Sequence, residues 1–470
     1  MNLELPGVES LDGWDAVKEY KFSFASAYRA AAYCPGRLGL NDCLRYRSSA
    51  GGLEAGATTA PLVSSALSDT AQASNPVPVS ITPTLQSPTE TADTSSRQET
   101  PASTTPKRGR VVIPEGEFPL VDTSLHSVPL SDILFDTFGG IPRSLPLDRA
   151  KDDRILSLRD AIAPILHADY GPPNALSWLR DDSLILGYVS GKDAYAYPIN
   201  ILDMHEIVND VFNGVPVLIT YCPLCFSGVV YHRELDGKLL TFGNTSALYQ
   251  SDLVMYDHQT GSYWFQVGGE AVVGELTGSH LSLLPSTTMA WGEWKRLYPQ
   301  TQLLTGMAGS PNRFNSGRYS RGFGGDYQGR INDERFIFPV DEKKLDSRLS
   351  AGEIVLTVEV GGKVTAFPLD IIGDGVVNHQ VDTEPVAVFI KASGGAVGAF
   401  SRVVDGKTLT FGYKQDSQDF VDQETSSVWD AAGRATGGPM SGVQLKRLNT
   451  RRSFWFSIAI ALPGVIVYTP

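Results

Sequence analysis

Residues 216–243 read PVLITYCPLCFSGVVYHRELDGKLLTFG, and a second stretch at residues 385–412 reads PVAVFIKASGGAVGAFSRVVDGKTLTFG. The two stretches align without a gap at an offset of 169, with ten identities in 28 positions. The similarity extends on both sides, so that WGEWKRLYPQTQLL (residues 291–304) falls opposite WFSIAIALPGVIVY (residues 455–468). A repeat of this length predicts two structurally related lobes.

Each copy has the pattern of a β-rich structure. Residues 215–221, VPVLITY, form a continuous apolar run that is typical of a buried strand. Residues 228–243 predict a hairpin with Asp236 and Gly237 at its tip, because Asp-Gly supplies the positive φ angles of a tight turn. Residues 206–210 are expected to close one short helix, and residues 288–297 to form another. We therefore predict an α+β, β-rich fold of two tandem pseudo-repeat lobes.

The apolar run at residues 454–468 is the closest approach to a membrane segment. It is interrupted by Pro463 and Gly464 and is shorter than the roughly 18 apolar residues that a membrane span needs. Its counterpart in the first copy carries Glu293, Lys295 and Arg296, which is typical of an amphipathic helix followed by a strand. We therefore expect a buried helix and strand here, and no transmembrane helix.

Composition separates the N-terminal part of the chain from the rest. The net charge is −13 with dispersed carboxylates, which argues against binding to nucleic acid. Ser, Thr, Pro and Ala dominate from about residue 56 to residue 109, and such a sequence cannot bury enough apolar surface to fold. The predicted organisation is an N-terminal segment with a degenerate export signal (residues 1–55), a disordered linker (56–109), a first lobe (110–304) that contains the C-x-x-C pair, a loop-rich connector (305–335) and a second lobe without cysteines (336–470).

The differences between the copies point to a local site in the first lobe. At five positions its cysteine, histidine and glutamate residues are replaced by other residue types in the second copy, which is nevertheless expected to fold without them. Opposite Cys222, Cys225, His205, Glu206 and His232 lie Lys391, Gly394, Asp374, Gly375 and Ser401.

Three roles remain open for the C-x-x-C pair Cys222–Cys225. With His205 and Glu206 it is a candidate site for zinc, copper or iron, since thiolates and imidazoles suit these metals. It is also a candidate dithiol redox centre, although Pro223 and the strand that follows do not match thioredoxin geometry. In the third interpretation it is an inert disulfide that closes a very small loop. His232, Asn209 and Asp210 are secondary candidates for the same site.

The combination of motifs around this pair resembles one family. YPINILDMHEIVNDVFNGVPVLITYCPLCFSG (residues 197–228) and LVMYDHQTGSYWFQ (residues 253–266) resemble the DUF3179 family over roughly residues 150–470. His205, Glu206, Asn209, Asp210, Cys222 and Cys225 match its pattern. The resemblance implies no established activity, but members commonly look exported or lipid-anchored, with a low-complexity tether before the domain.

Taken together, the sequence predicts an extracytoplasmic metal-binding or redox protein, with no reaction indicated. The alternative is a non-catalytic ligand-binding or structural surface module in which Cys222 and Cys225 form a disulfide. A small-molecule or protein partner is compatible with either, and the sequence identifies none.

Overall fold

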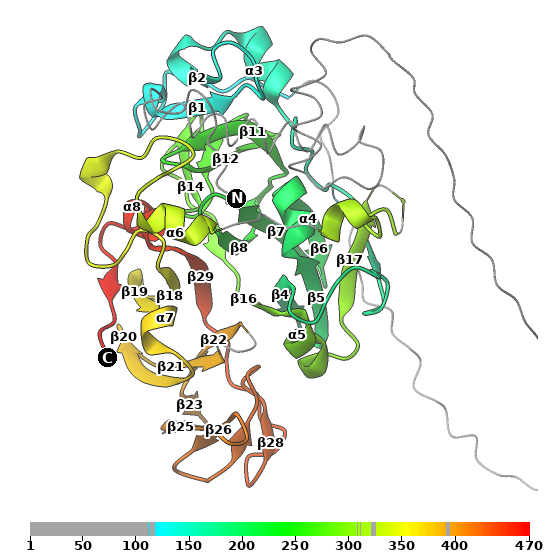
Figure 1. Ribbon diagram of the computed structural model, residues 1–470, viewed down its shortest axis with the longest axis vertical. Helices are drawn as coiled ribbons and strands as arrows, with labels where there is room; N and C mark the ends of the chain where they lie inside the picture. The colour runs from blue at the N-terminus through cyan, green and yellow to red at the C-terminus, as the bar shows by residue number, and fades with distance from the viewer. Residues whose placement is uncertain (1–110, 112–117, 308, 311, 321–325, 392–394) are drawn as a thin grey trace, which may run out of the picture. The chain divides into compact units, whose positions relative to one another are not determined.

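The computed structural model of the chain describes residues 111, 118–307, 309–310, 312–320, 326–391 and 395–470. The predictions for residues 1–55 and 56–109 lie outside the described residues. The prediction of a β-rich fold is confirmed: the described chain forms several antiparallel and mixed sheets joined by short helices (Figure 1).

The largest sheet has eight strands and joins the two halves of the sequence. β29 pairs with β8 through a single bridge between Arg452 and Gly228, so strands from residues 207–232 and 354–467 share one sheet. Its order is β30 (Ile466–Val467), β19 (Lys363–Pro368), β18 (Ile354–Val360), β29 (Asn449–Phe454), β8 (Ser227–His232), β7 (Val215–Cys222) and β6 (Ile207–Phe212), with β15 (Ser282–Leu283) paired to β8.

Two further sheets belong to the first half of the chain. A six-stranded sheet has the order β14 (Glu270–Val273), β13 (Tyr263–Phe265), β12 (Asp252–Asp257), β11 (Phe242–Tyr249), β1 (Ile133–Asp136) and β2 (Ser144–Pro146). A five-stranded sheet has the order β16 (Ser286–Ala290), β4 (Leu184–Ser190), β5 (Asp193–Pro198), β17 (Gln302–Met307) and β3 (Ala168–Gly171).

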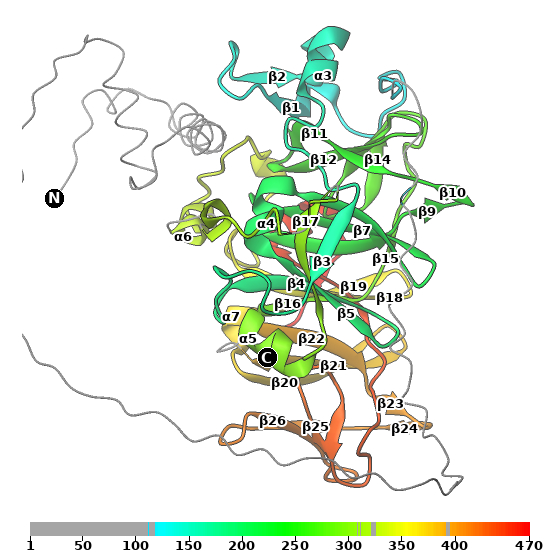
Figure 2. The ribbon, with the colours of Figure 1, turned by 90° about the vertical axis from the view of Figure 1, so that its right-hand side faces the viewer.

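The second half adds smaller sheets. One contains β20 (Gly375–Val381), β21 (Glu384–Lys391) and β22 (Ala396–Ser401), and another contains β25 (Phe411–Lys414), β26 (Asp419–Asp422), β27 (Val428–Trp429) and β28 (Ala435–Gly437). Two hairpins of two-residue strands complete the set, β9 (Glu234–Leu235) with β10 (Lys238–Leu239) and β23 (Val403–Val404) with β24 (Lys407–Thr408) (Figure 2).

The helices are short and lie between strands. The α-helices are α3 (Asp152–Leu158), α4 (Ile199–His205), α5 (Trp291–Leu297), α6 (Tyr327–Asn332), α7 (Leu369–Ile372) and α8 (Trp455–Ala461), and the 3₁₀ helices are η2 (Leu130–Asp132), η3 (Leu147–Arg149), η4 (Gly317–Ser320) and η5 (Glu342–Lys344). None of the helices within the described ranges is both long enough and apolar enough to cross a membrane.

The two halves pair their strands in corresponding ways. In the first half, neighbouring strands pair in the order β16, β4, β5 and β17, with two antiparallel pairings followed by a parallel one. In the second half, the order β29, β18, β19 and β30 has the same sequence of pairings. The predicted helix and strand at residues 454–468 are confirmed as α8 and β30, and the Asp236–Gly237 turn closes the β9–β10 hairpin with positive φ at both residues.

The expectation that residues 206–210 close a short helix is wrong. α4 ends at His205, Glu206 takes a left-handed conformation with a φ of 55°, and β6 begins at Ile207. All six residues of β6 are buried and pair with β7, and this strand environment outweighs the weak helical pattern of Glu206 to Asp210. The end of α4 therefore lies beside the start of a central strand.

Packing between layers fixes where the sheets meet. α5 sets the Trp294 ring directly on Gly187 of β4, where a Cβ atom would lie 2.3 Å from the ring, so only glycine fits. A separate core cluster contains Cys222 and Cys225 together with Trp264 of the six-stranded sheet and Phe456 of α8. Both cysteines therefore lie inside the protein, between sheets, and not in an exposed loop.

Candidate metal centre

The two cysteines meet a carboxylate from a different sheet. Cys222 ends β7, Cys225 lies in the turn to β8, and Asp252 begins β12. Their two Sγ atoms and one carboxylate oxygen all lie within 4.8 Å of one another, and all three residues are at most 1% exposed. Among the described residues, no other group of three or more His, Cys, Asp and Glu residues has this proximity.

Two tight turns position these residues. Phe226 has a φ of 56°, which brings the chain back so that Cys222 pairs with Ser227. Gln250 and Ser251 have φ angles of 49° and 62°, which is the pattern of a two-residue hairpin turn between Tyr249 and Asp252. Non-glycine residues rarely adopt positive φ, so both turns are held by the surrounding packing.

Other elements anchor the cysteine turn through its carbonyl groups. The Leu224 carbonyl accepts a hydrogen bond of 2.8 Å from the Tyr327 hydroxyl of α6. The Cys225 carbonyl accepts bonds of 2.9 Å from both the Phe454 N–H and the Ser453 hydroxyl of β29. The turn is thus fixed by residues from both halves of the chain.

Cys225 and Asp252 are directly hydrogen bonded. The Cys225 thiol donates to Asp252 Oδ1 at 2.9 Å and lies 3.2 Å from the Ser227 hydroxyl. Asp252 Oδ1 also accepts from the Leu253 N–H at 2.7 Å, and Oδ2 accepts from the Ser457 hydroxyl of α8 at 3.3 Å. Both carboxylate oxygens are therefore held in place.

A buried polar network surrounds the centre. The Ser227 hydroxyl donates to Gln266 Oε1 at 2.6 Å, and Gln266 Nε2 donates to the Thr220 hydroxyl at 2.7 Å. All three side chains are fully buried. Such a network keeps the groups around a ligand set in fixed orientations.

Burial favours the protonated form of every group in the centre. It raises the pKa of Cys222, raises that of Cys225 well above its usual range, and raises that of Asp252 to about 6. A metal ion that binds here must therefore displace thiol protons, so its affinity increases with pH.

His205 and Glu206 make hydrogen bonds outside this centre, and Glu206 alone acts on it electrostatically. His205 Nδ1 bonds the Ala163 carbonyl at 2.8 Å, and Nε2 lies 3.3 Å from the Tyr319 hydroxyl. Burial lowers the pKa of His205 to about 4, so its ring is neutral at pH 7. The Glu206 carboxylate accepts from Asn244 at 2.6 Å and contributes to the raised pKa of Cys222. The three-residue group contains neither, and their role as ligands stays a prediction.

The secondary candidates have structural partners. His232 is partly exposed at the far end of β8, with Nδ1 3.4 Å from the Glu234 carbonyl. Asp210 accepts from the Tyr170 hydroxyl at 2.9 Å. Asn209 donates to and accepts from the backbone of Phe242.

The second half repeats the Asn209 arrangement. Asn378 makes the same two bonds to the backbone of Phe411. An arrangement that occurs where there are no cysteines stabilises the fold and is not specific to the centre.

Asp252 is the member of the group that was not predicted as a ligand. The offset between the copies falls from 169 at Gly243 to 165 at Tyr256, which shows four extra residues in the first copy. They lengthen the β11–β12 hairpin, which pairs as far as Tyr249 with Asp252, whereas β25–β26 ends at Lys414 with Asp419. This length difference is the sequence signal that could have identified Asp252.

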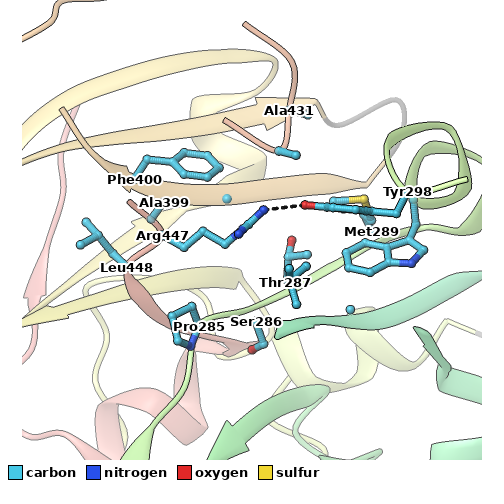
Figure 3. Close-up of a pocket in the computed structure, with 15 residues that line it drawn as sticks. Pro285, Ser286, Thr287, Met289, Tyr298, Ala399, Phe400, Ala431, Arg447 and Leu448 are labelled. Carbon is cyan, nitrogen blue, oxygen red and sulfur yellow. Dashed lines mark hydrogen bonds between the residues drawn. The ribbon is translucent and has the colours of Figure 1, made fainter. Parts of the chain in front are cut away.

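A hollow elsewhere in the protein is too small to be a comparable site. It lies between β4 and β16 on one side and β22 on the other, where Arg447 donates to the Tyr298 hydroxyl at 2.8 Å (Figure 3). Its volume is about 30 Å³, which is room for roughly one or two water molecules. Small-molecule sites are at least ten times larger.

Comparison with known proteins identifies the family but no activity. The family described as "Protein of unknown function (DUF3179)" matches residues 159–463. No curated protein and no solved structure matches the chain significantly. The chain belongs to the DUF3179 family.

Proposed function

We propose that this protein is an extracytoplasmic metal-binding protein in which Cys222, Cys225 and Asp252 hold one transition-metal ion. The observation that carries the proposal is the convergence of three buried ligand atoms within 4.8 Å of one another. Two thiolates on one tetrahedral zinc ion at bond lengths of about 2.3 Å lie about 3.8 Å apart, so binding would draw ligand atoms now within 4.8 Å of one another closer by up to about 1 Å.

The donor set favours zinc. Two thiolates with one carboxylate combine sulfur and oxygen donors, which zinc accepts readily, whereas copper(I) favours sulfur alone. Three protein ligands leave a fourth position of a tetrahedral site for water or a substrate. Copper and iron are the competing metals, and no reaction is proposed.

The hydrogen bond between Cys225 and Asp252 argues against the inert disulfide. Oxidation to a disulfide would remove the thiol proton that Cys225 donates to Asp252. A fully buried carboxylate would then lose a donor, which is unfavourable. Cys222 and Cys225 are free thiols in the structure, and their burial restricts access by a redox partner.

We further propose that the two halves are tandem lobes that share one architecture. The corresponding strand orders and the matching Asn209 and Asn378 arrangements support this. Asp257 and Trp264 are joined by a hydrogen bond from the indole N–H to the carboxylate, as are Asp422 and Trp429. The extracytoplasmic location is supported by the Ser/Thr/Pro-rich sequence before residue 110 and is tested by fractionation of cells that express the full chain.

Elemental analysis of the purified full-length protein tests the metal site. We expect one zinc ion per chain and loss of most of it in Cys222→Ser and Asp252→Asn, because each removes a donor. The double variant Cys34→Ser/Cys43→Ser is the matched control, since it removes the two other cysteines and should keep its zinc.

His205→Ala separates two outcomes at the same site. Retention of zinc shows that the three-residue group suffices, and loss of zinc shows that His205 supplies the fourth ligand. Folded wild-type protein that neither contains a metal ion nor takes up zinc, copper or iron would overturn the proposal.

A further inference from the structure

Ser227 adjoins the candidate metal centre. It is the first residue of β8 and pairs directly with Cys222, the last residue of β7. Directly opposite residues of neighbouring strands point to the same face of the sheet, so the Ser227 hydroxyl and the Cys222 thiol share a face. The Ser227 Oγ atom also lies 3.2 Å from Cys225 Sγ, and the residue is fully buried. The hydroxyl is therefore next to one cysteine and on the same face as the other.

The hydrogen bonds of Gln266 fix the direction of the Ser227 hydroxyl. The Thr220 hydroxyl donates its single hydrogen to the Val229 carbonyl at 2.9 Å, so it accepts from Gln266 Nε2 at 2.7 Å. The same Nε2 group lies 3.4 Å from the Ser227 carbonyl, which can only accept. The Oε1 atom of Gln266 therefore faces the Ser227 hydroxyl and accepts its hydrogen at 2.6 Å.

The contact between Ser227 and Cys225 is left without a hydrogen. The single hydrogen of the Ser227 hydroxyl is directed at Gln266, so the lone pairs of Oγ face the cysteine. The Cys225 thiol directs its own hydrogen to Asp252 Oδ1 at 2.9 Å. Two atoms with lone pairs thus face each other at 3.2 Å, which is unfavourable unless a cation binds both. The arrangement is that of two ligands of one cation.

The distance suits a tetrahedral metal ion. Zinc binds thiolate sulfur at about 2.3 Å and oxygen at about 2.0–2.2 Å, so a sulfur and an oxygen ligand on one tetrahedral ion lie about 3.5 Å apart. The observed 3.2 Å between Ser227 Oγ and Cys225 Sγ is close to this value. All four candidate ligand residues are at most 1% exposed: Cys222, Cys225, Ser227 and Asp252. Four protein ligands shielded from solvent are typical of structural zinc sites.

The second half of the chain forms the corresponding strands without this network. In place of three buried polar residues it has apolar residues that are also buried. The pairing register of the two strands at this position is the same in both halves. Burying hydroxyl and amide groups costs free energy, so the fold alone does not account for them. Opposite Thr220, Ser227 and Gln266 lie Phe389, Ala396 and Ala431.

We propose that the Ser227 hydroxyl is the fourth ligand of the metal ion held by Cys222, Cys225 and Asp252, and that Gln266 positions it. The oxygen binds the ion through its lone pairs, while its hydrogen remains bonded to Gln266 Oε1. A neutral hydroxyl adds no negative charge to a buried site that already contains two thiolates and a carboxylate. The assignment rests on the proposed metal site and fills the position that its three ligands leave open.

Cobalt(II) substitution in the full-length protein tests the assignment, because the absorption of bound cobalt reports its thiolate ligands. Ser227→Cys places a thiol at the fourth position and should increase the thiolate-to-cobalt charge-transfer absorption. A purely structural role of Ser227 would not change this absorption. Ser401→Cys is the matched control, since Ser401 is a buried serine of β22, the strand that corresponds to β8, and a thiol there should leave the absorption unchanged.

Zinc affinity, measured in competition with a chelator, provides a second readout. Ser227→Ala should bind zinc at least about tenfold more weakly, since losing even a residue that only hydrogen-bonds a ligand costs about that much. This variant should fold, because Ala396 begins the corresponding strand β22. Gln266→Leu frees the Ser227 hydrogen to bond the Cys225 thiolate, which should weaken zinc binding and shift the charge-transfer band to higher energy.

The outcomes separate this assignment from the metal site itself. Equal zinc affinity of wild type and Ser227→Ala, or a cobalt spectrum of Ser227→Cys that matches wild type, would overturn the assignment and leave a three-residue site. Loss of zinc in His205→Ala, which would give the fourth position to His205, would overturn it as well. Wild-type protein that takes up no metal would overturn the metal site and the assignment together.

Discussion

The corresponding strands β7 and β21 each end at a buried residue close to a carboxylate, but the residue types differ. β21 ends at Lys391, whose Nζ lies 3.2 Å from the Glu293 carboxylate of α5. β7 ends at Cys222, close to Asp252, and the Ser457 hydroxyl of α8 bonds that carboxylate. Each strand end thus combines with a carboxylate and with a helix from the other half of the chain.

The two carboxylates differ in their preferred charge. Burial would raise the pKa of Glu293, but the bonds and charges of Arg296 and Lys391 outweigh it and hold that pKa below its usual range. Burial raises the pKa of Asp252 to about 6, and the hydrogen bonds that it accepts only partly oppose this. The β21 end contains its own cation, whereas the β7 end holds protons in positions where a metal cation can bind.

The largest expected effect is a pH dependence that only the β7 end has. In the metal-free protein, Asp252 has a pKa of about 6 when folded, against about 3.9 when unfolded. The folded state then binds this proton more tightly, so the contribution of Asp252 to stability is fully present below about pH 4 and is lost as the pH rises through 6. The loss is at most about 3 kcal/mol.

Urea unfolding of the metal-free protein between pH 5 and 7 measures this slope. Buried histidines such as His205, whose pKa is lowered to about 4, add a slope of opposite sign that wild type and Asp252→Asn share. The contribution of Asp252 is therefore the difference between the slopes of wild type and Asp252→Asn, and variants at the β21 end should not change it. Equal slopes in wild type and Asp252→Asn would contradict the prediction.

The next effect concerns the ion pair at the β21 end. Lys391→Met leaves Glu293 largely buried with Arg296 as its remaining partner, so we expect destabilisation by about 2 kcal/mol. Zinc content should not change, since the site lies at the other strand end. A double-mutant cycle tests whether the effect comes from Glu293. Lys391→Met should destabilise the Glu293→Gln protein less than it destabilises the wild type, because the carboxylate that pairs with Lys391 is already gone. An equal loss in both proteins would show that Lys391 acts independently of Glu293.

The sequence predicted the turn, the C-terminal helix and the two cysteines of the candidate site, but not Asp252. The Asp236–Gly237 turn depends on adjacent residues and was predicted from them, and the helix at 455–461 was predicted from its amphipathic counterpart in the first copy. Cys222 and Cys225 stood out because Lys391 and Gly394 replace them in the second copy. Asp252 joins them only because the six-stranded sheet packs against the eight-stranded sheet, and no local periodicity encodes that contact.

The prediction around His205 failed locally for a related reason. A continuation of the helix past His205 looked plausible from Glu206 to Asp210, but pairing of β6 with β7 determines that segment. The left-handed Glu206 then turns the chain so that its neighbour His205 bonds Ala163 and reaches Tyr319, which is 114 residues away. Neither partner is identifiable from spacing, because both come from distant loops.

The smallest expected effect concerns the hairpin extension that carries Asp252. Ser251 has a φ of 62°, and its buried hydroxyl has no hydrogen-bond partner among the residues that the structure describes. Glycine adopts this angle without strain and is the residue preferred at the second position of such a turn. Ser251→Gly should therefore stabilise the protein by about 0.5–1 kcal/mol, a gain reduced by the greater freedom of glycine in the unfolded chain. Unchanged zinc content in this variant, measured beside its urea midpoint, would show that Asp252 is positioned by strand pairing and packing. A loss of zinc would show instead that the strained turn itself positions the Asp252 carboxylate. The β25–β26 hairpin in the second half of the chain is shorter and has no residue that corresponds to Asp252.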